Sequence, residues 1–324
     1  MSLSRMNVLI SSVGRQSFLV QSFQSALRSR GSVFVADYNP DSPAFKVADK
    51  SFVSPSFSDA QYINWILQTC RSENVNLLFT LNVDDLCILE NHRHEFESIG
   101  CRLIGGPVKS ILMSLDKYHV MHFCENLGLP VIKTKLKEDH PADLNFPIIA
   151  KPRYGKGSRG MKFLYSEAEL NSFLTETESI KEKDAFVFQE VMKGEEYGFD
   201  IINDFNRNFA AVLVRRKISM KNGETEEAIT LDSEPWIQFA QQVSSQIQHE
   251  GLIDIDAIVI DNQPYIMDIN FRFGGGYIFS HLAGADVPRA YIAWSRGETA
   301  KQEWFTPEPN ITHCRSVFQK NPSH

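Results

Sequence analysis

The sequence has no pair of cysteines at the spacing of a metal or redox motif. Its five cysteines are scattered along 324 residues and include no Cys-x-x-Cys pair. An odd, scattered set argues against a disulfide framework and against a zinc site. We therefore expect a cytoplasmic protein, because thiols stay reduced in that compartment.

Long hydrophobic runs and an excess of basic residues are also missing. No stretch approaches the roughly 18 apolar residues that cross a membrane, and the first residues lead into a predicted strand without the apolar core of a signal peptide. The net charge is −7 and the pI is about 5.8. This acidic balance argues against nonspecific binding to nucleic acid or to an anionic membrane.

The N-terminal part lacks the glycines of a dinucleotide-binding fingerprint. Strands and helices alternate there, which predicts a parallel, Rossmann-like α/β sheet; the strands are expected at 7–12, 32–37 and 75–80 and the helices at 18–29, 62–71 and 86–98. Only Gly14 follows the first strand, where Gly-x-Gly-x-x-Gly is required. An NAD-dependent dehydrogenase with Asp37 as its ribose-binding acid is therefore the least favoured interpretation.

Oxygen ligands are present near the C-terminal end, in a segment that predicts a β-hairpin. A β-branched run from Asp256 to Ile260 is followed by a turn and a second strand that ends at Asn270. Asp268 and Asn270 are two residues apart and share a face, and the first strand brings Asp256 opposite them. Two carboxylates and an amide suit Mg²⁺ better than zinc. The alternative is a surface hairpin with solvated acids.

Glycines and lysines are concentrated in a second segment. A predicted strand ends on Lys151, and a loop containing Gly155, Gly157, Ser158 and Gly160 precedes the next strand. Glycine-rich backbone leaves N–H groups available to phosphate oxygens, and cations at the loop match their charge. Because two strands flank it, the loop is not a Walker A motif. A plain flexible hairpin is the alternative.

Two weaker signals lie on either side of this loop. Lys117 occupies the first turn of a predicted helix that Gly128 and Pro130 end. A lysine there opposes the helix dipole, a mismatch that a phosphate partner would relieve. After the loop, strands around Glu190 and Glu196 flank a short connection that could offer an adenine its backbone groups.

Taken in order, these segments resemble the ATP-grasp superfamily, and most closely single-ATP-grasp proteins similar to the carbamoyl phosphate synthase large subunit. The resemblance covers residues 117–284, with the Rossmann-like segment before it. It implies a two-lobed fold, α+β in its C-terminal part, in four units: 1–107 as a Rossmann-like domain, 108–188 as linker helices and a small lid, 189–300 as the C-terminal subdomain with the metal site, and 301–324 as a tail.

The resemblance also implies roles for individual residues. Cofactor binding would fall to residues that surround ATP: Lys117, Lys151, Gly155, Gly157, Ser158, Gly160, Gln189, Glu190, Val191 and Glu196. Two Mg²⁺ ions, or Mn²⁺, would lie on Asp256, Asp268 and Asn270, and Arg272 with Lys151 would stabilise the transferred phosphoryl group. Substrate contacts are expected from the loops of the first domain, from the Arg215–Arg216 strand and from the glycine turn; the residues named for them are Arg15, Arg216, Gly275 and Gly276.

An ATP-dependent ligase that joins a small-molecule carboxylate to an amine or thiol is therefore the leading hypothesis, with a homodimer as the assembly considered. Two positions depart from the family pattern. Asp268 stands where glutamate is usual, and Phe271 replaces the proline of Asn-Pro-Arg. The second hypothesis, which these departures support, is a nucleotide-binding or regulatory protein with reduced catalysis.

Overall fold

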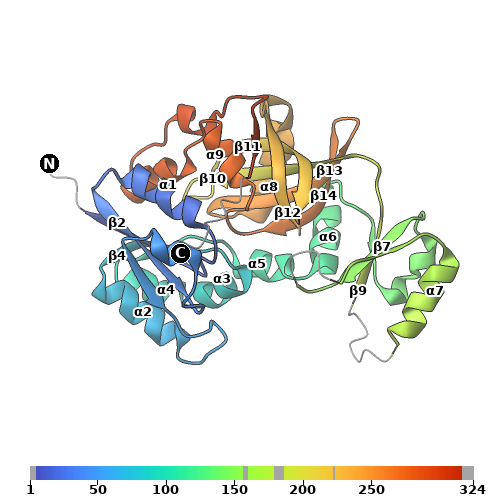
Figure 1. Cartoon of the computed structure of the whole chain (residues 1–324), viewed down its shortest axis with the longest axis horizontal. Helices are drawn as coiled ribbons and strands as arrows, with labels where there is room; N and C mark the ends of the chain where they lie inside the picture. Colours follow the sequence, from blue (N-terminus) through green and yellow to red (C-terminus); the bar gives the residue numbers. More distant parts are fainter. Residues whose placement is uncertain (1–4, 156–159, 179–185, 222, 316–324) are drawn as a thin grey trace, which may run out of the picture.

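The protein is built on three β-sheets that follow one another along the chain (Figure 1). The computed structural model describes residues 5–155, 160–178, 186–221 and 223–315. The sheets are a parallel N-terminal sheet, a four-stranded sheet in a small lobe, and a six-stranded antiparallel sheet. The fold expected from the resemblance, a Rossmann-like domain followed by two lobes, is confirmed.

The N-terminal domain has the strand order β3-β2-β1-β4-β5, with all neighbours parallel. Its strands are β1 Met6–Ser11, β2 Gly31–Asp37, β3 Lys50–Val53, β4 Val75–Thr80 and β5 Arg102–Leu103, and its helices are α1 Ser17–Leu27, α2 Tyr62–Ser72, α3 Val83–Glu90 and α4 Arg93–Ser98. The strands β1 and β4 are buried almost throughout, as expected for a sheet covered by helices on both faces.

The single helix expected at 86–98 is wrong, because two helices occupy this segment. The first begins earlier, at Val83, where the Asn82 side chain accepts a hydrogen bond from the Asp84 N–H at 3.0 Å. The break follows Glu90. There the Asn91 side chain donates to the Cys87 carbonyl at 3.0 Å, in competition with the backbone.

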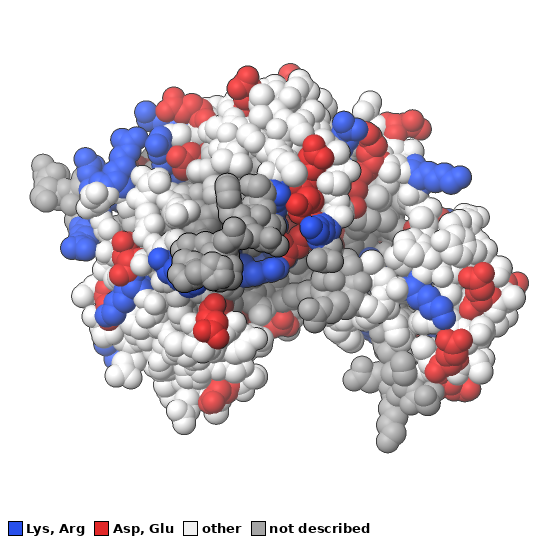
Figure 2. All heavy atoms as spheres, in the orientation of Figure 1, with Lys and Arg blue, Asp and Glu red and all other residues white. Residues whose placement is uncertain are grey.

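The small lobe follows two connecting helices, α5 Val108–Ser114 and α6 Lys117–Asn126. Its strands run in the order β6-β9-β7-β8 and are β6 Thr134–Lys135, β7 Ile148–Pro152, β8 Lys162–Leu164 and β9 Phe186–Glu190. Helix α7, Glu167–Glu176, packs Leu170 and Phe173 against Ile148 and Leu164 on one face. Alternation along β7 therefore places Lys151 on the other face. Figure 2 shows this lobe projecting from the body, with a hollow between it and the N-terminal domain.

The large sheet has the order β14-β13-β10-β11-β12-β15. Its strands are β10 Glu195–Asn203, β11 Phe209–Lys221, β12 Glu224–Leu231, β13 Gly251–Ile260, β14 Gln263–Asn270 and β15 Thr312–Cys314; helices α8 Ile237–Ile247, α9 Tyr277–Leu282 and α10 Val287–Ser295 accompany them. Short 3-10 helices lie elsewhere in the chain, at η1 Pro43–Lys46, η2 Lys137–Asp139, η3 Pro141–Asp143, η4 Glu234–Trp236 and η5 Gln302–Phe305.

The segment after Gly297, which includes the start of the tail expected at 301–324, is tied to this sheet as far as the structure describes it. Strand β15 pairs with β12, and the Arg315 N–H donates to the Glu226 carbonyl at 2.8 Å. The polar composition of the segment reflects an edge position, because an edge strand has one solvent-facing side.

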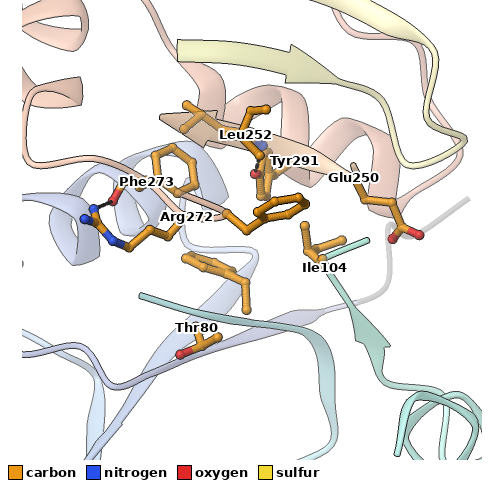
Figure 3. Close-up of a pocket in the computed structure, with 11 residues that line it drawn as sticks. Thr80, Ile104, Glu250, Leu252, Arg272, Phe273 and Tyr291 are labelled. Carbon is orange, nitrogen blue, oxygen red and sulfur yellow. Dashed lines mark hydrogen bonds between the residues drawn. The ribbon is translucent and has the colours of Figure 1, made fainter. Parts of the chain in front are cut away.

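Aromatic side chains join the N-terminal domain to the large sheet. Phe23 of α1 and Phe79 of β4 pack on Phe273 and Tyr291, with ring centroids 5.0–6.0 Å apart. A cavity of about 10 Å³ remains at this seam, room for about one water. Figure 3 shows Arg272 extending away from the aromatic residues that line it. The seam is thus closely packed next to a predicted catalytic residue.

Candidate active site

One face of the large sheet carries the predicted metal ligands. In the β13–β14 pairing Asp256 lies opposite Asp268, and Asp254 lies opposite Asn270. On the other side of β13, Asp256 pairs with Gly198 of β10. The side chains that alternate onto this face form rows of charged residues across the strands, and their opposite face packs against α8 as a hydrophobic core.

A lysine that the sequence interpretation did not select lies in the middle of these acids. The Lys217 ammonium is 2.7 Å from Asp256 Oδ1 and 2.7 Å from Glu196 Oε1, and its side chain is 6% exposed. Burial lowers the pKa of Lys217, but Asp256 and Glu196 outweigh burial, so that the pKa is raised overall. Alternation along the strand places Lys217 on the same face as Arg215, but it does not show that acids of β10 and β13 lie beside it.

The two predicted phosphate-binding lysines lie near the same acids. Burial lowers the pKa of Lys151 to about 8; Asp268 opposes this shift, the Lys117 ammonium adds to it, and Asp256 and Glu196 oppose it. Residues from four separate segments are thus close enough to Lys151 to act on its charge. Lys117 donates from Nζ to the Gly155 carbonyl at 2.7 Å, which ties it to the glycine-rich loop.

A buried ion pair holds the segments that carry these lysines together. Arg153, two residues after Lys151, donates to both Asp116 oxygens at 2.9 and 2.8 Å. Asp116 is also the N-cap of α6, accepting from the Tyr118 and His119 N–H groups, and so it immediately precedes Lys117. The Lys117 N–H donates to the Arg153 carbonyl at 3.2 Å. A bidentate pair of this kind fixes orientation as well as distance.

The glycine-rich loop is described only at its ends. Gly155 and Gly160 have φ angles of +108° and +77°, a region that favours glycine. Gly157 and Ser158 lie outside the described residues. The expected contact of this loop with phosphates therefore stays a prediction.

The connection between the lobes uses several of its polar groups internally. Gln189 donates to Thr134 Oγ1 at 2.6 Å, and the Glu190 carboxylate accepts from the Asn145 N–H at 3.0 Å. The Val191 N–H donates to the Pro147 carbonyl at 3.0 Å. An adenine contact at this hinge must therefore use other backbone groups or replace these bonds.

The residues named for substrate contacts separate into two groups. Arg15, 77% exposed, is 2.5 Å from Glu224, and Glu224 also accepts from Arg315 at 2.8 Å. Arg315 in turn donates to the Gly275 carbonyl, so that Arg15 and Gly275 are brought to one network. Arg216 is not part of it: its side chain is 37% exposed and pairs with Glu195.

Of the two adjacent arginines on β11, Arg215 is the inner one. It forms ion pairs with Asp200 and Asp254. Substrate contacts were expected from this strand, but Arg215 is fully buried. Gly276 lies directly against it, because an added Cβ would be 2.2 Å from Arg215 Nε.

Arg272 follows strand β14, which carries Asp268 and Asn270, and it lies near Asp254. Its Nη1 donates to the Phe273 carbonyl at 3.0 Å, and its charge lowers the pKa of Asp254, whose pKa is nevertheless raised, chiefly by burial. The flanking Phe271 and Phe273 are both buried. The Arg272 guanidinium is thus hydrogen-bonded to the backbone of the next residue, and its side chain extends away from the packed seam (Figure 3).

The acids fit a hard divalent cation only together with further oxygen ligands. Across the described ranges, no three His, Cys, Asp or Glu side chains gather in a metal-binding cluster. Asp256, Asp268 and Asn270 supply oxygen donors, and Asn270 Nδ2 lies 3.3 Å from Asp268 Oδ2. This donor set matches the way Mg²⁺ is bound by a few carboxylates plus phosphate oxygens.

Two family models match consecutive parts of the chain. The model described as the ATP-grasp domain matches residues 114–276, half of the chain. The model described as the PylC-like N-terminal domain matches residues 8–104. The first match confirms the resemblance that the motifs indicated. Residues 105–113 lie between the two matches, and the domain boundary expected at residue 107 stays a prediction.

Curated relatives are carbamoyl phosphate synthase large chains. The protein from Saccharolobus islandicus (strain L.S.2.15 / Lassen #1) is 22% identical over 279 residues, 82% of this chain and 26% of its own length. The protein from Vibrio cholerae is 23% identical over 228 residues, 65% of this chain and 21% of its own length. The chain therefore spans about a fifth to a quarter of the relatives it matches.

Solved structures with the same fold include nucleotide complexes. The biotin carboxylase domain of the 2-oxoglutarate carboxylase from Hydrogenobacter thermophilus, with MgADP, ADP and bicarbonate, has a TM-score of 0.73 at 17% identity, covering 97% of this chain and 75% of that chain. An ADP complex of PurK, N5-carboxyaminoimidazole ribonucleotide synthetase, has a TM-score of 0.70 at 18% identity, covering 90% and 78%. At these identities the likeness shows the fold. No helix in the described part of this chain is long and apolar enough to cross a membrane.

We predict that nucleotide affinity depends on pH through Lys151. Below its pKa of about 8 the ammonium is already charged, and ATP binds without proton uptake. Above pH 8 binding must return a proton to Lys151, so the dissociation constant rises by up to about tenfold per pH unit. Isothermal titration of ATP from pH 6.5 to 9.5 measures this change.

The dissociation constant of ATP plotted against pH should therefore show a break near pH 8. Lys151→Arg should remove this break, because a guanidinium stays charged throughout this range. Lys301→Arg, on an exposed lysine paired with Glu303, is the matched control and should keep the break. An unchanged break in Lys151→Arg would show that another group is responsible.

We also predict that the Asp116–Arg153 pair stabilises the fold. Arg153→Met leaves a buried carboxylate without its main partner, and the free energy of unfolding should fall by about 3–5 kcal/mol. Urea denaturation followed by circular dichroism measures the loss. Lys50→Met, which breaks an exposed pair with Glu73, should cost no more than about 1 kcal/mol. Equal losses in the two variants would contradict the prediction.

Proposed function

Because this chain belongs to the ATP-grasp family, we propose that it is an ADP-forming ligase that activates a small-molecule carboxylate with ATP and transfers the acyl group to an amine or a thiol. The observation that carries the proposal is the convergence on Lys151. Lys117, Glu196, Asp256 and Asp268, from four segments of the chain, all act on its pKa. This clustering of cations with oxygen ligands suits a polyphosphate.

The reaction proceeds in two balanced steps. A carboxylate oxygen of the substrate attacks the γ-phosphorus, the bond to the β–γ bridging oxygen breaks, and ADP leaves. The resulting acyl phosphate is then attacked at carbon by the amine or thiol, which loses a proton as inorganic phosphate departs. No side chain is identified as a general base.

The protein contributes position and charge. Lys117 of α6 and Lys151 of the small lobe hold the phosphates, and Arg272 meets the phosphoryl group from the large sheet. Lys217, which now neutralises Asp256 and Glu196, is placed to follow the negative charge when nucleotide enters. Fixed charges of this kind stabilise developing negative charge without reorganising during the reaction.

Asp256, Asp268 and Asn270 would hold Mg²⁺. When bound, the ion would neutralise phosphate oxygens and polarise the phosphorus toward attack. Lys217 would give up its contact with Asp256, so the chain exchanges one cation for another on that carboxylate. The number of ions, expected to be two, remains part of the proposal.

The small share of its relatives that this chain covers limits how much of their activity can be proposed for it. The chain corresponds to a fifth to a quarter of a carbamoyl phosphate synthase large chain, so that protein's full reaction is not proposed for it. A second candidate is a protein that binds nucleotide without catalysis. It is favoured by Asp268, whose side chain is shorter than the usual glutamate, and by Phe271 in place of proline.

ADP release with Mg²⁺-ATP, measured against pooled carboxylates and amines, tests the proposal. Release should require one acid and one nucleophile, and Lys151→Ala and Asp268→Asn should each lower it by about 100-fold or more, because each removes charge that acts on the transferred group. Lys301→Ala is the control. Binding of ATP without release under any combination would favour the second candidate, and absence of ATP binding would refute both.

A further inference from the structure

We call the face of the large sheet that carries the predicted metal ligands the catalytic face. Its most deeply buried cation, Arg215, has no part in the roles described so far. Arg215 is 1% exposed, and its two terminal nitrogens lie 2.5 Å from Asp200 Oδ2 and 2.7 Å from Asp254 Oδ1. Its third nitrogen, Nε, is buried without a hydrogen-bond partner among the described residues. We call Arg215, Asp200 and Asp254 the ion triad.

The ion triad lies beside the predicted metal ligands on the same face of the large sheet. In the strand register Gly198 of β10 lies between Arg215 and Asp256. Asp254 precedes Asp256 by two residues on the same strand face and pairs with Asn270. Asp256 and Asn270 of the predicted metal site therefore each have a register neighbour that belongs to the triad or lies against it.

Glycines surround the guanidinium where side chains would displace it. A Cβ at Gly198 would lie 2.9 Å from Arg215 Cζ, and a Cβ at Gly276 would lie 2.2 Å from its Nε. A Cβ at Gly274 would lie 2.2 Å from Asp254 Cγ. Two of the three consecutive glycines thus allow the turn to approach the protein's own ion triad.

We propose that Arg215 is a positioning residue that holds the turn from Arg272 to Gly276 against the catalytic face. The turn begins at the predicted phosphoryl-stabilising residue and lies on the triad through two glycines. With the guanidinium in place, Asn270 and Arg272 are fixed at the end of β14. The effect on the reaction rests on the proposed function, whereas the effect on the turn does not.

Two substitutions separate position from simple loss of stability. Arg215→Lys keeps the charge but loses the fork that reaches both acids. Gly276→Ala leaves every charge of the triad intact and forces the turn away from Nε. If Arg215 acts through the turn, the two variants share one defect, and the double variant is no worse than the poorer single one.

Steady-state kinetics of ADP release gives the first readout. Each variant should lower kcat by about 10- to 100-fold, the scale of a small misplacement of a catalytic group. The KM for ATP should stay within about twofold of the parent value, because Lys117 and Lys151 are unchanged in both variants. Arg289→Lys, in the ion pair with Asp286 on α10, should leave both constants unchanged.

Hydrogen exchange gives a readout that needs no activity. In Arg215→Lys and in Gly276→Ala, backbone amides of residues 270–277 should exchange at least about tenfold faster than in the parent protein, while those of β7 and α7 keep their rates. Unchanged exchange at 270–277 in both variants would overturn the inference, whatever the activity. If the two variants exchange faster at 270–277 but the parent protein releases no ADP, the result supports the positioning role and counts against the proposed function alone.

Discussion

Buried charge on one face of the large sheet is the constraint on which the rest of the site depends. Glu196, Asp200, Asp254, Asp256 and Asp268 share that face, and the two that are buried, Asp200 and Asp254, must be neutralised or protonated. Burial raises the pKa of Asp200 and Asp254 even with a guanidinium between them. The sheet meets this demand with Arg215, and Lys217 pairs with Asp256 and Glu196. Of these two cations, Lys217 is the one proposed to give up its contact with a carboxylate when Mg²⁺ binds.

The opposite requirement holds near Lys151, because the ammonium groups of Lys117 on α6 and Lys151 on β7 lie near each other. Burial, and to a smaller extent the Lys117 charge, lower the pKa of Lys151. The Asp116–Arg153 pair supplies the rigidity, since it joins the start of α6 to the end of β7 with two parallel hydrogen bonds. Lys117 and Lys151 thus lie near acids of the large sheet, and this arrangement of opposite charges supports the proposed binding of Mg²⁺-ATP between them.

The sequence predicted the parts of this arrangement that follow from alternation along a single hairpin. Asp256, Asp268 and Asn270 share a face because the register follows from an apolar pattern and a short turn. The alternation of side chains along β11 could not by itself decide which of Arg215 and Arg216 is buried, since both faces of the strand carry charged residues. Lys217 was missed because its partners come from β10 and β13, and pairing between distant strands is not written in local periodicity. The helix break after Glu90 depends on a side-chain bond of Asn91, which competes with a helical pattern that otherwise continues.

Phe271 shows how a departure from the family pattern can keep the geometry it replaces. Proline restricts the backbone by its ring, whereas Phe271 is held by burial, with its ring 3.3 Å from the position of a Cβ on Gly106. Phe273 is buried in the aromatic seam on the other side of Arg272. Packing on both sides therefore fixes the Arg272 backbone without a proline. Asp268 has no such substitute for its missing methylene, so the predicted metal site, and not the arginine, is where the second candidate function would place reduced catalysis.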